Sequence, residues 1–390
     1  MKLADFGTLT GGERAVVAGL GTGHVTLLGD GTLPGAGAGE DRQVRASLIR
    51  WLALDAPGDD KVRLQEKGLR IAGALVVSDG QVDPFLGGES TPGLDLEGCS
   101  LAYDLALIAC RFQHAPLLGR ARVQSLFLSG AALPGLRADG LEARGNVFML
   151  GAHATGEVRL LGARVGGDLA CEGGRFENAD GDALNANGLK VRGSVFLRGV
   201  RATGAVGLLS ARLGGDLACV GGRFENAGGT ALSADGLEAR GGVSLRGVDA
   251  TGEFRLLGAR IGGDFDCEGV QLENAGDRAL GAQGARVMGA LFWREGSHAT
   301  GAIDLTAAEI GDICDDPAFW PGPGDLLLNR CRYGAFTGTG VSGAERIRWL
   351  DLQTPERFGK NFWPQPWEHC AMVLREMGHA EDARQVLIAK

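Results

Sequence analysis

The sequence lacks the features of a membrane protein, of a secreted protein and of many sugar-binding enzymes. No apolar run is long enough to suggest a membrane-spanning helix, and the N-terminal stretch MKLADFGTLTGGERAVVAG contains no apolar segment of signal-peptide length. We therefore expect a cytoplasmic chain without a membrane span. Only two of the 390 residues are tyrosine, which leaves few aromatic platforms for a polysaccharide.

Motifs with known chemistry are also missing. The chain contains no G-x-S-x-G, no H-E-x-x-H, no Walker phosphate-binding loop and no C-x-x-C pair. The stretch GLGTG at residues 19–23 matches half of a dinucleotide fingerprint, but the HVTLLGDG that follows is typical of a strand and not of the required helix. We predict no metal and no cofactor, and the sequence favours a non-catalytic protein.

Glycine, by contrast, is abundant, with 67 residues in a chain whose apolar content is an ordinary 44%. Because the glycines do not follow the three-residue period of collagen, they predict many tight corners between short strands. The formal net charge is -9, which weakly disfavours nonspecific binding to nucleic acid or to anionic membranes.

A motif of fourteen residues recurs at a fixed interval of 48 positions. GGDLACEGGRFENA occupies residues 166–179, GGDLACVGGRFENA occupies residues 214–227, and GGDFDCEGVQLENA begins at Gly262. One period divides into segments of 11, 11, 11 and 15 residues, and each 11 divides into a five and a six that usually end in a small residue. Short strands joined by glycine corners then make one turn of 22 residues and a second of 26. This pattern predicts a mainly β fold, a parallel β-helix with four sides.

Alternation along each short strand identifies the inward side chains. Val147 and Met149 would stack on Leu169 and Cys171 in a wholly apolar column, whereas the opposite register would bury charged residues such as Arg198. The inward register is therefore fixed by the sequence.

Three further sets of residues recur at the same interval. The cysteines would lie about 10 Å apart, beyond disulfide reach, so we expect buried free thiols at Cys171, Cys219 and Cys267. The same spacing is too wide for a retaining carboxylate pair and at the limit of an inverting pair, so we expect hydrogen bonds to corner amides from Asp168, Asp216, Asp264 and Asp312. A ladder of corner asparagines is expected at Asn178, Asn226 and Asn274.

Pieces such as LEARG, LKVRG and ARVGG give the sequence a resemblance to the pentapeptide-repeat proteins. The resemblance extends over residues 62–333 and is clearest over residues 141–314. It implies a right-handed quadrilateral β-helix. Some members of that family imitate the shape and charge of DNA and protect type II topoisomerases from inhibitors, so it also implies that role. The chain departs from the family pattern by mixing faces of five and six residues and by one expanded corner in each period.

The two ends of the chain differ from the repeat. We expect a flexible lead-in at residues 1–39 and an amphipathic capping helix in EDRQVRASLIRWLALD, residues 40–55, capped by Glu40 or Asp41. Residues 366–390 predict a helical hairpin that resembles one tetratricopeptide unit and docks on the last coil in preference to another subunit. The predicted domains are residues 1–60, 61–350 and 351–390. A monomer, or a homodimer formed through a terminal cap, is expected.

Two outward columns are candidate binding surfaces. The first column lies on the side of the coils that contains LEARG, residues 141–145. It has two acidic residues, Glu142 and Glu238, and eight basic residues: Arg144, Arg164, Lys190, Arg192, Arg212, Arg240, Arg260 and Arg286. A basic strip on an acidic chain suits an acidic protein partner or a polyanion, although arginines that only solubilise the surface and pair with the glutamates would give the same pattern. The neighbouring side carries Phe148, Phe196 and Phe292 with small residues between them, which predicts shallow apolar hollows for a protein partner, or a face covered by a loop or terminal segment.

The sequence leaves three functional hypotheses. The first is a non-catalytic scaffold that binds a macromolecular partner, most simply a protein, through the basic strip and the apolar face. The second is the topoisomerase-protecting DNA mimic that the family resemblance implies. The third is a β-helix enzyme with a groove beside the expanded corners, for which the candidate acids and bases are Glu177, Glu225, Arg175 and Arg223.

Overall fold

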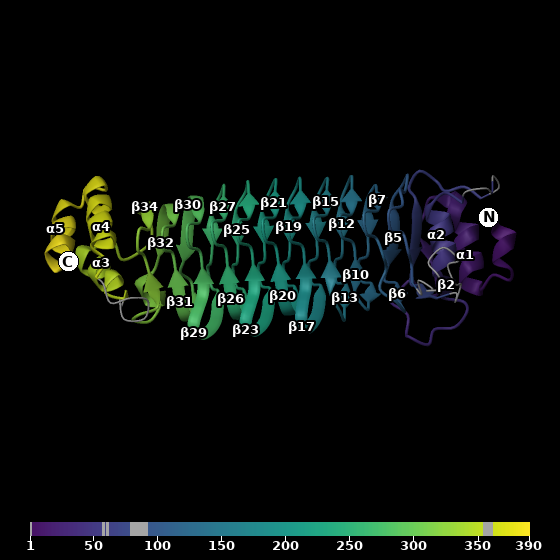
Figure 1. The fold of residues 1–390 in the computed structure, drawn as a ribbon, viewed down its shortest axis with the longest axis horizontal. Coiled ribbons are helices and arrows are strands. Elements are labelled where there is room, and N and C mark those ends of the chain that lie inside the picture. The colour runs from purple at the N-terminus through teal and green to yellow at the C-terminus, as the bar shows by residue number, and fades with distance from the viewer. Residues whose placement is uncertain (1, 57–58, 60–61, 79–92, 354–361) are drawn as a thin grey trace. The chain divides into compact units, whose positions relative to one another are not determined.

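The structure is a computed structural model that describes residues 2–56, 59, 62–78, 93–353 and 362–390. Its contacts divide the chain into two units, Met1–Phe196 and Leu197–Lys390, which we describe in turn. In each unit short parallel strands joined by tight corners stack coil upon coil, and the α-helices lie in the N-terminal part of the first unit and the C-terminal part of the second (Figure 1). The predicted mainly β fold, a parallel solenoid, is confirmed. No helix among the residues described is long and apolar enough to cross a bilayer.

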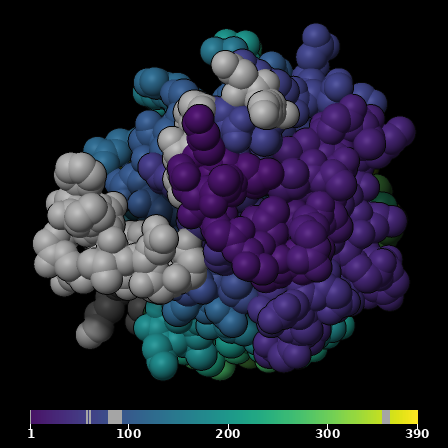
Figure 2. Space-filling view, turned by 90° about the vertical axis from the view of Figure 1, so that its right-hand side faces the viewer, coloured from purple at the N-terminus to yellow at the C-terminus, as the bar shows by residue number. Residues whose placement is uncertain are grey.

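The first unit begins with helices, so the prediction of a loose lead-in was wrong. They are η1 (Leu3–Phe6), α1 (Gly11–Gly19), η2 (Leu20–Thr22) and α2 (Ala46–Ala53). A capping box starts α1, because the side chains of Thr10 and Glu13 each bond the other's backbone N–H. Burial would raise the pKa of the Glu13 carboxyl, but hydrogen bonds from Arg45 and from the Thr10 N–H lower that pKa overall. Figure 2 shows this N-terminal segment spread over the end of the unit that faces the viewer.

The predicted capping helix is present but shorter than expected. Residues 43–45 form strand β2 instead, and Gln43 pairs in parallel with Leu75. Because these residues hydrogen-bond to a neighbouring strand, the helix starts only at Ala46, its N-cap is Arg45, and neither Glu40 nor Asp41 caps it. The apolar side of the helix is buried as predicted, with relative exposures of 4% or less at Leu48, Trp51 and Leu52.

The coils of the first unit repeat at the predicted interval. Glu142 pairs with Arg164, 22 positions later, and Arg164 pairs with Lys190, 26 positions later. The strands of this unit are β1 (Thr26–Leu27), β2 (Gln43–Arg45), β3 (Leu69–Ala72), β4 (Leu75–Val77), β5 (Leu105–Ile108), β6 (Arg111–Phe112), β7 (Arg122–Val123), β8 (Leu126–Phe127), β9 (Ala132–Leu133), β10 (Leu136–Arg137), β11 (Glu142–Ala143), β12 (Val147–Phe148), β13 (His153–Ala154), β14 (Val158–Arg159), β15 (Arg164–Val165), β16 (Leu169–Ala170), β17 (Arg175–Asn185), β18 (Lys190–Val191) and β19 (Val195–Phe196).

The second unit continues the same alternation of turns. Arg212 pairs with Glu238 after 26 positions, and Glu238 pairs with Arg260 after 22. Its elements are β20 (Arg201–Gly207), β21 (Arg212–Leu213), β22 (Leu217–Ala218), β23 (Arg223–Ser233), β24 (Glu238–Ala239), β25 (Val243–Ser244), β26 (Asp249–Arg255), β27 (Arg260–Ile261), β28 (Phe265–Asp266), β29 (Gln271–Gly281), β30 (Arg286–Trp293), β31 (His298–Asp304), β32 (Glu309–Asp315), η3 (Pro317–Phe319), β33 (Leu326–Leu327), β34 (Arg332–Phe336), α3 (Gly343–Leu350), α4 (Pro364–Glu376) and α5 (Ala380–Ala389).

The interior of each coil is the apolar column that alternation predicted. Val147, Leu169 and Val195 lie in register on adjacent coils and are fully buried. Cys171, Cys219 and Cys267 are buried and free, as predicted. Burial raises the pKa of the Cys171 and Cys219 thiols to about 12, so both stay protonated and act as small apolar residues.

Three of the four recurring aspartates accept hydrogen bonds from corner amides in the next coil, as predicted, whereas the side chain of Asp312 makes no hydrogen bond within the described part of the chain. Asp168 Oδ1 accepts a hydrogen bond from Ser194 N at 2.8 Å, and Asp264 Oδ1 accepts one from Ala290 N at 2.9 Å. Asp216 makes the equivalent bond with the amide of Gly242. Carboxylates engaged in this way are structural parts of the corners.

The recurring asparagines act locally within the expanded corners. Asn178, Asn226 and Asn274 each donate from Nδ2 to the backbone carbonyl four residues later, at 2.6 to 2.9 Å. Each asparagine therefore stabilises its own corner through the backbone. The three side chains recur as predicted, but these hydrogen bonds do not join one asparagine to the next.

The C-terminal helical hairpin is confirmed, and it docks on the last coil within the same unit. α4 and α5 pack against each other, and α4 contacts β34. One helix, α3, was not predicted. It starts at a capping box formed by Ser342 and Glu345 and packs against α5.

Side chains of α4 satisfy the backbone of the last strand. Tyr333 N donates to His369 Nε2 at 2.9 Å, and Phe336 N donates to Met377 Sδ at 3.4 Å. Gln365 bonds the backbone just before the strand through both atoms of its amide. The exposed edge that a strand would otherwise offer to another strand is thus occupied by a helix.

Candidate functional site

The basic strip of the first unit lies on the side formed by β7, β11, β15 and β18. Arg122, Glu142, Arg164 and Lys190 occupy equivalent outward positions on successive coils. Glu142 accepts hydrogen bonds from Arg122 Nε at 3.0 Å and from Arg164 Nη1 at 2.8 Å. These two guanidinium groups lower the pKa of the Glu142 carboxyl. One carboxylate is therefore shared by two arginines.

A second outward position on the same side carries uncompensated charge. Continuing the register of β11, β15 and β18 by one residue places Arg144, Gly166 and Arg192 on successive coils. A Cβ added to Gly166 would overlap the carbonyl oxygen of Arg144, so the coils approach too closely for any other residue there. Arg144, Lys190 and Arg192 are exposed, and within the described chain none of the three has an ion pair or a hydrogen bond from its side chain.

These residues form one surface around a glycine. We call Arg122, Arg144, Arg164, Lys190 and Arg192 the cationic face. Its five positive charges meet one carboxylate, that of Glu142. Because Gly166 has no side chain, no side chain stands between those of Arg144 and Arg192 at this outward position of the stack.

The corresponding strip of the second unit is largely neutralised. Glu238 lies 3.3 Å from Arg212 and 3.2 Å from Arg260, and Arg286 lies 3.1 Å from Glu309. The pairing that we weighed as the alternative explanation of the strip therefore describes most of this unit. The remaining predicted residue of the strip, Arg240, is exposed, and its side chain makes no hydrogen bond or ion pair with the described residues.

The apolar side of the first unit is more closed than predicted. Phe148, Ala170 and Phe196 lie in register on successive coils, but Ala170 is only 4% exposed, so little of the expected hollow remains open. Phe148 stacks instead on Phe127 of the preceding coil, with ring centroids 5.1 Å apart, and the Arg70 guanidinium lies 5.8 Å from the Phe127 ring. The aromatic feature of this side is therefore a half-buried stacked pair.

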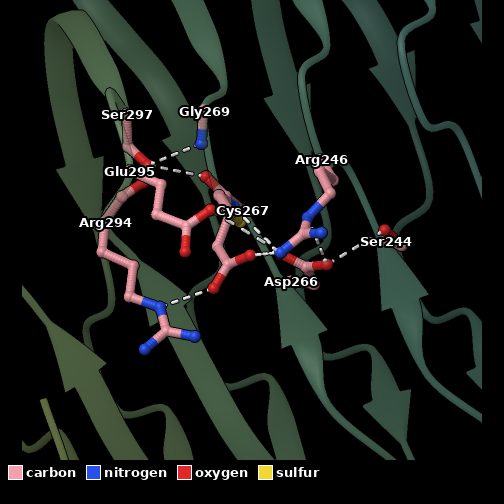
Figure 3. A network of polar contacts seen from close by, with 9 residues as sticks. Ser244, Arg246, Asp266, Cys267, Gly269, Arg294, Glu295 and Ser297 are labelled. Carbon is pink, nitrogen blue, oxygen red and sulfur yellow. Dashed lines mark hydrogen bonds and ion pairs between the residues drawn. The ribbon is translucent and has the colours of Figure 1, made fainter.

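In the second unit the predicted aromatic residue joins a polar network. Phe292 lies under the guanidinium of Arg294, whose Nε donates to Glu268 at 2.5 Å. Glu268 is 2% exposed and is also paired with Arg246. Arg246 in turn reaches Asp266 at 3.6 Å (Figure 3). Burial raises the pKa of the Asp266 carboxyl although Arg246 lies beside it.

This network braces three successive coils. Arg246, Glu268 and Arg294 alternate in charge, so each link joins a coil to the next one. Ser297 extends the brace, since its hydroxyl donates to the Cys267 carbonyl at 2.8 Å and accepts from Gly269 N at 3.1 Å (Figure 3). Sequence reasoning missed the set, although its alternating signs, 22 and 26 positions apart, were visible.

Three of the four candidate catalytic residues, Glu177, Arg223 and Glu225, lie close to neighbouring titratable side chains. In the first unit, Glu177 lies 3.3 Å from His153 Nε2, and Arg175 is exposed on the same strand. In the second unit, Arg223 Nε donates to Glu225 at 2.6 Å and lies 3.8 Å from Asp249. Arg223 thus pairs with Glu225 of its own strand and with Asp249 of the next coil. No cluster of side chains that could hold a metal ion occurs in the residues described.

A comparison of the chain with protein-family profiles, curated proteins and solved structures found no match.

Proposed function

We propose that the chain is a non-catalytic β-solenoid scaffold that binds an acidic protein partner on the cationic face of its first unit. The observation that supports this proposal is the exposure of Arg144, Lys190 and Arg192 around Gly166 without a partner side chain among the residues described. A rigid coil needs no particular outward residue for its stability, so uncompensated charge collected on one side points to an interaction. The stacked Phe127 and Phe148 rings lie beyond the next corner and extend the surface with an apolar contact.

Charge also favours a protein over a long polyanion. A nucleic acid would extend beyond the cationic face and meet a chain whose net charge is -9. The topoisomerase-protecting role implied by the pentapeptide-repeat resemblance requires an acidic surface, which is the opposite of this face. We also propose that the protein is a cytoplasmic monomer. In this proposal it shares the architecture of the pentapeptide-repeat proteins and binds its partner on the charged side of the coils.

A capture experiment tests the proposal. The face variant carries Arg144→Glu, Lys190→Glu and Arg192→Glu. The control variant makes the same change in charge at exposed arginines outside the basic strip, with Arg137→Glu, Arg201→Glu and Arg330→Glu. Proteins captured from an extract of the source organism are identified by mass spectrometry. We expect an acidic protein that wild type and control retain and the face variant loses, with equal thermal midpoints for all three. Identical capture by the three baits would refute the proposal.

A further inference from the structure

The spacing of the cationic face points to the secondary structure of its partner. Parallel strands in adjacent coils lie about 4.8 Å apart, so equivalent positions two coils apart are separated by about 9.6 Å. Arg164 and Lys190 are one coil apart, and Arg144 and Arg192 are two coils apart. A partner that lies along the stack of coils therefore meets positive charge at intervals of about 4.8 Å and about 9.6 Å.

We infer that the partner segment is an acidic α-helix that lies along the stack of coils over Gly166; this inference rests on the proposed function. Helical residues three and four apart are separated by about 5 to 6 Å, and residues seven apart by about 10.5 Å along the axis. Both intervals match the cationic face within the reach of arginine and lysine side chains. An extended segment places side chains on one side only at intervals of about 6.7 Å, which falls out of step with the coils.

The floor of the surface suits a helix of this kind. Gly166 places no side chain between Arg144 and Arg192, and only Arg164 of the four surrounding cations has a carboxylate partner among the residues described. A helix with glutamates at positions i, i+3 or i+4, and i+7 would set the middle glutamate above the glycine and the outer two against Arg144 and Arg192. Guanidinium groups form two parallel hydrogen bonds with carboxylates, which fixes the direction of each contact.

Three labelled probes distinguish this inference from the proposed function. The first is a 20-residue peptide with glutamates at i, i+4 and i+7 on one side of a helix. The second has the same composition and charge with two central prolines that prevent a helix. The third is a single-stranded oligonucleotide of 20 thymidines. Binding is measured by fluorescence anisotropy at low salt, and helix formation by circular dichroism of the mixture.

We expect the helical peptide to bind about tenfold more tightly than the proline peptide and to gain helicity on binding, since only the helix sets both outer glutamates against arginines and two surface charge pairs together give a factor of about that size. The face variant should lose that tenfold, and the control variant should not. Equal affinity for both peptides, each lost in the face variant, would overturn the helix and leave the proposed function standing. Peptide binding that the face variant retains would overturn both. Tighter binding of the oligonucleotide than of either peptide would replace the protein partner with a nucleic acid.

Discussion

The seating of α3 on the last coil depends on one buried ion pair. Arg346 is fully buried, and its Nη1 and Nη2 donate to the two carboxylate oxygens of Asp315 at 2.8 and 2.7 Å. Trp320 Nε1 donates to the same carboxylate at 2.7 Å, and the Arg346 guanidinium lies 3.7 Å from the centre of the Phe336 ring. The pair thus joins a helix to a strand inside an aromatic cluster.

Replacing one residue of the pair should lower the free energy of unfolding more than replacing both. Arg346→Met leaves the Asp315 carboxylate buried without its cation, and Asp315→Asn leaves the guanidinium buried without its anion. We expect each single substitution to lower the free energy of unfolding of the C-terminal part by about 3 to 5 kcal/mol. The double variant Asp315→Leu and Arg346→Met buries no charge, so its loss should be smaller than that of either single variant.

Hydrogen exchange of the α3 and β34 amides measures this local stability, and urea unfolding followed by tryptophan fluorescence measures the global one. A matched control is Arg384→Met, which removes an exposed pair with Glu381 and should leave exchange in α3 unchanged. Single variants that lose less than about 1 kcal/mol, or a double variant worse than both singles, would refute the assignment of the pair as a buried clamp.

Three further predictions concern the corners and the ends. The Cβ that Gly193→Ala adds would overlap the corner carboxylate of Asp168 in the preceding coil. We expect the free energy of unfolding in urea to fall by about 1 to 3 kcal/mol. The control is Gly37→Ala, whose Cβ meets no other atom and which should leave that free energy unchanged. The pKa of Glu13 is lower in the folded state than in the unfolded state. Its contribution to stability is therefore present above the unfolded-state pKa and is lost as pH falls through the folded-state pKa. Glu13→Gln should make the thermal midpoint depend less on pH in the acid range. Burial holds the pKa of His369 below its ordinary value of 6.5, so the unfolded state takes up a proton before the folded state does as pH falls. Protection of the β34 amides from exchange should therefore fall as pH drops through about 6.5. Protection that is constant between pH 5 and 8 would contradict the last of these.

The repeat made the coils predictable because it constrains every level of structure at once. A fixed interval with alternating apolar residues sets the register, and the register in turn places Val147 on Leu169 and Glu142 beside Arg164. The corner role of Asp168 followed from its distance to the next acid. None of these conclusions needed knowledge of distant contacts, because each coil packs only on its neighbours.

Helices outside the repeat had no such redundancy. Both missed α-helices begin with a capping box, at Thr10 with Glu13 and at Ser342 with Glu345, so a local signal existed. In α1 two glycines follow the cap and lower the helix propensity, and α3 has only eight residues. The helix predicted from Glu40 failed for the opposite reason, because strand pairing of residues 43–45 took over its first turn.

Side-chain pairing on the surface was the least predictable part of the candidate site. Counting charges on the LEARG side predicted a continuous basic strip, but the strip of the second unit is mostly paired because Glu309 reaches Arg286 and Glu238 lies between two arginines. In the first unit, Glu142 is the one glutamate of the strip that lies between two arginines in this way. The difference lies in which of the neighbouring outward residues is acidic, and the repeat does not constrain that choice.

The treatment of the last strand bears on where a partner can bind. A solenoid end offers a row of N–H and C=O groups that would pair with another copy of the chain. On β34, His369 of α4 and Met377, the C-cap of that helix, accept from the N–H groups of Tyr333 and Phe336, and Gln365 bonds the backbone just before the strand. A helix spaced in this way ends the growth of the sheet without offering a new edge. The partner that we propose would then bind on a side of the coils, where the arginines without a partner among the described residues lie.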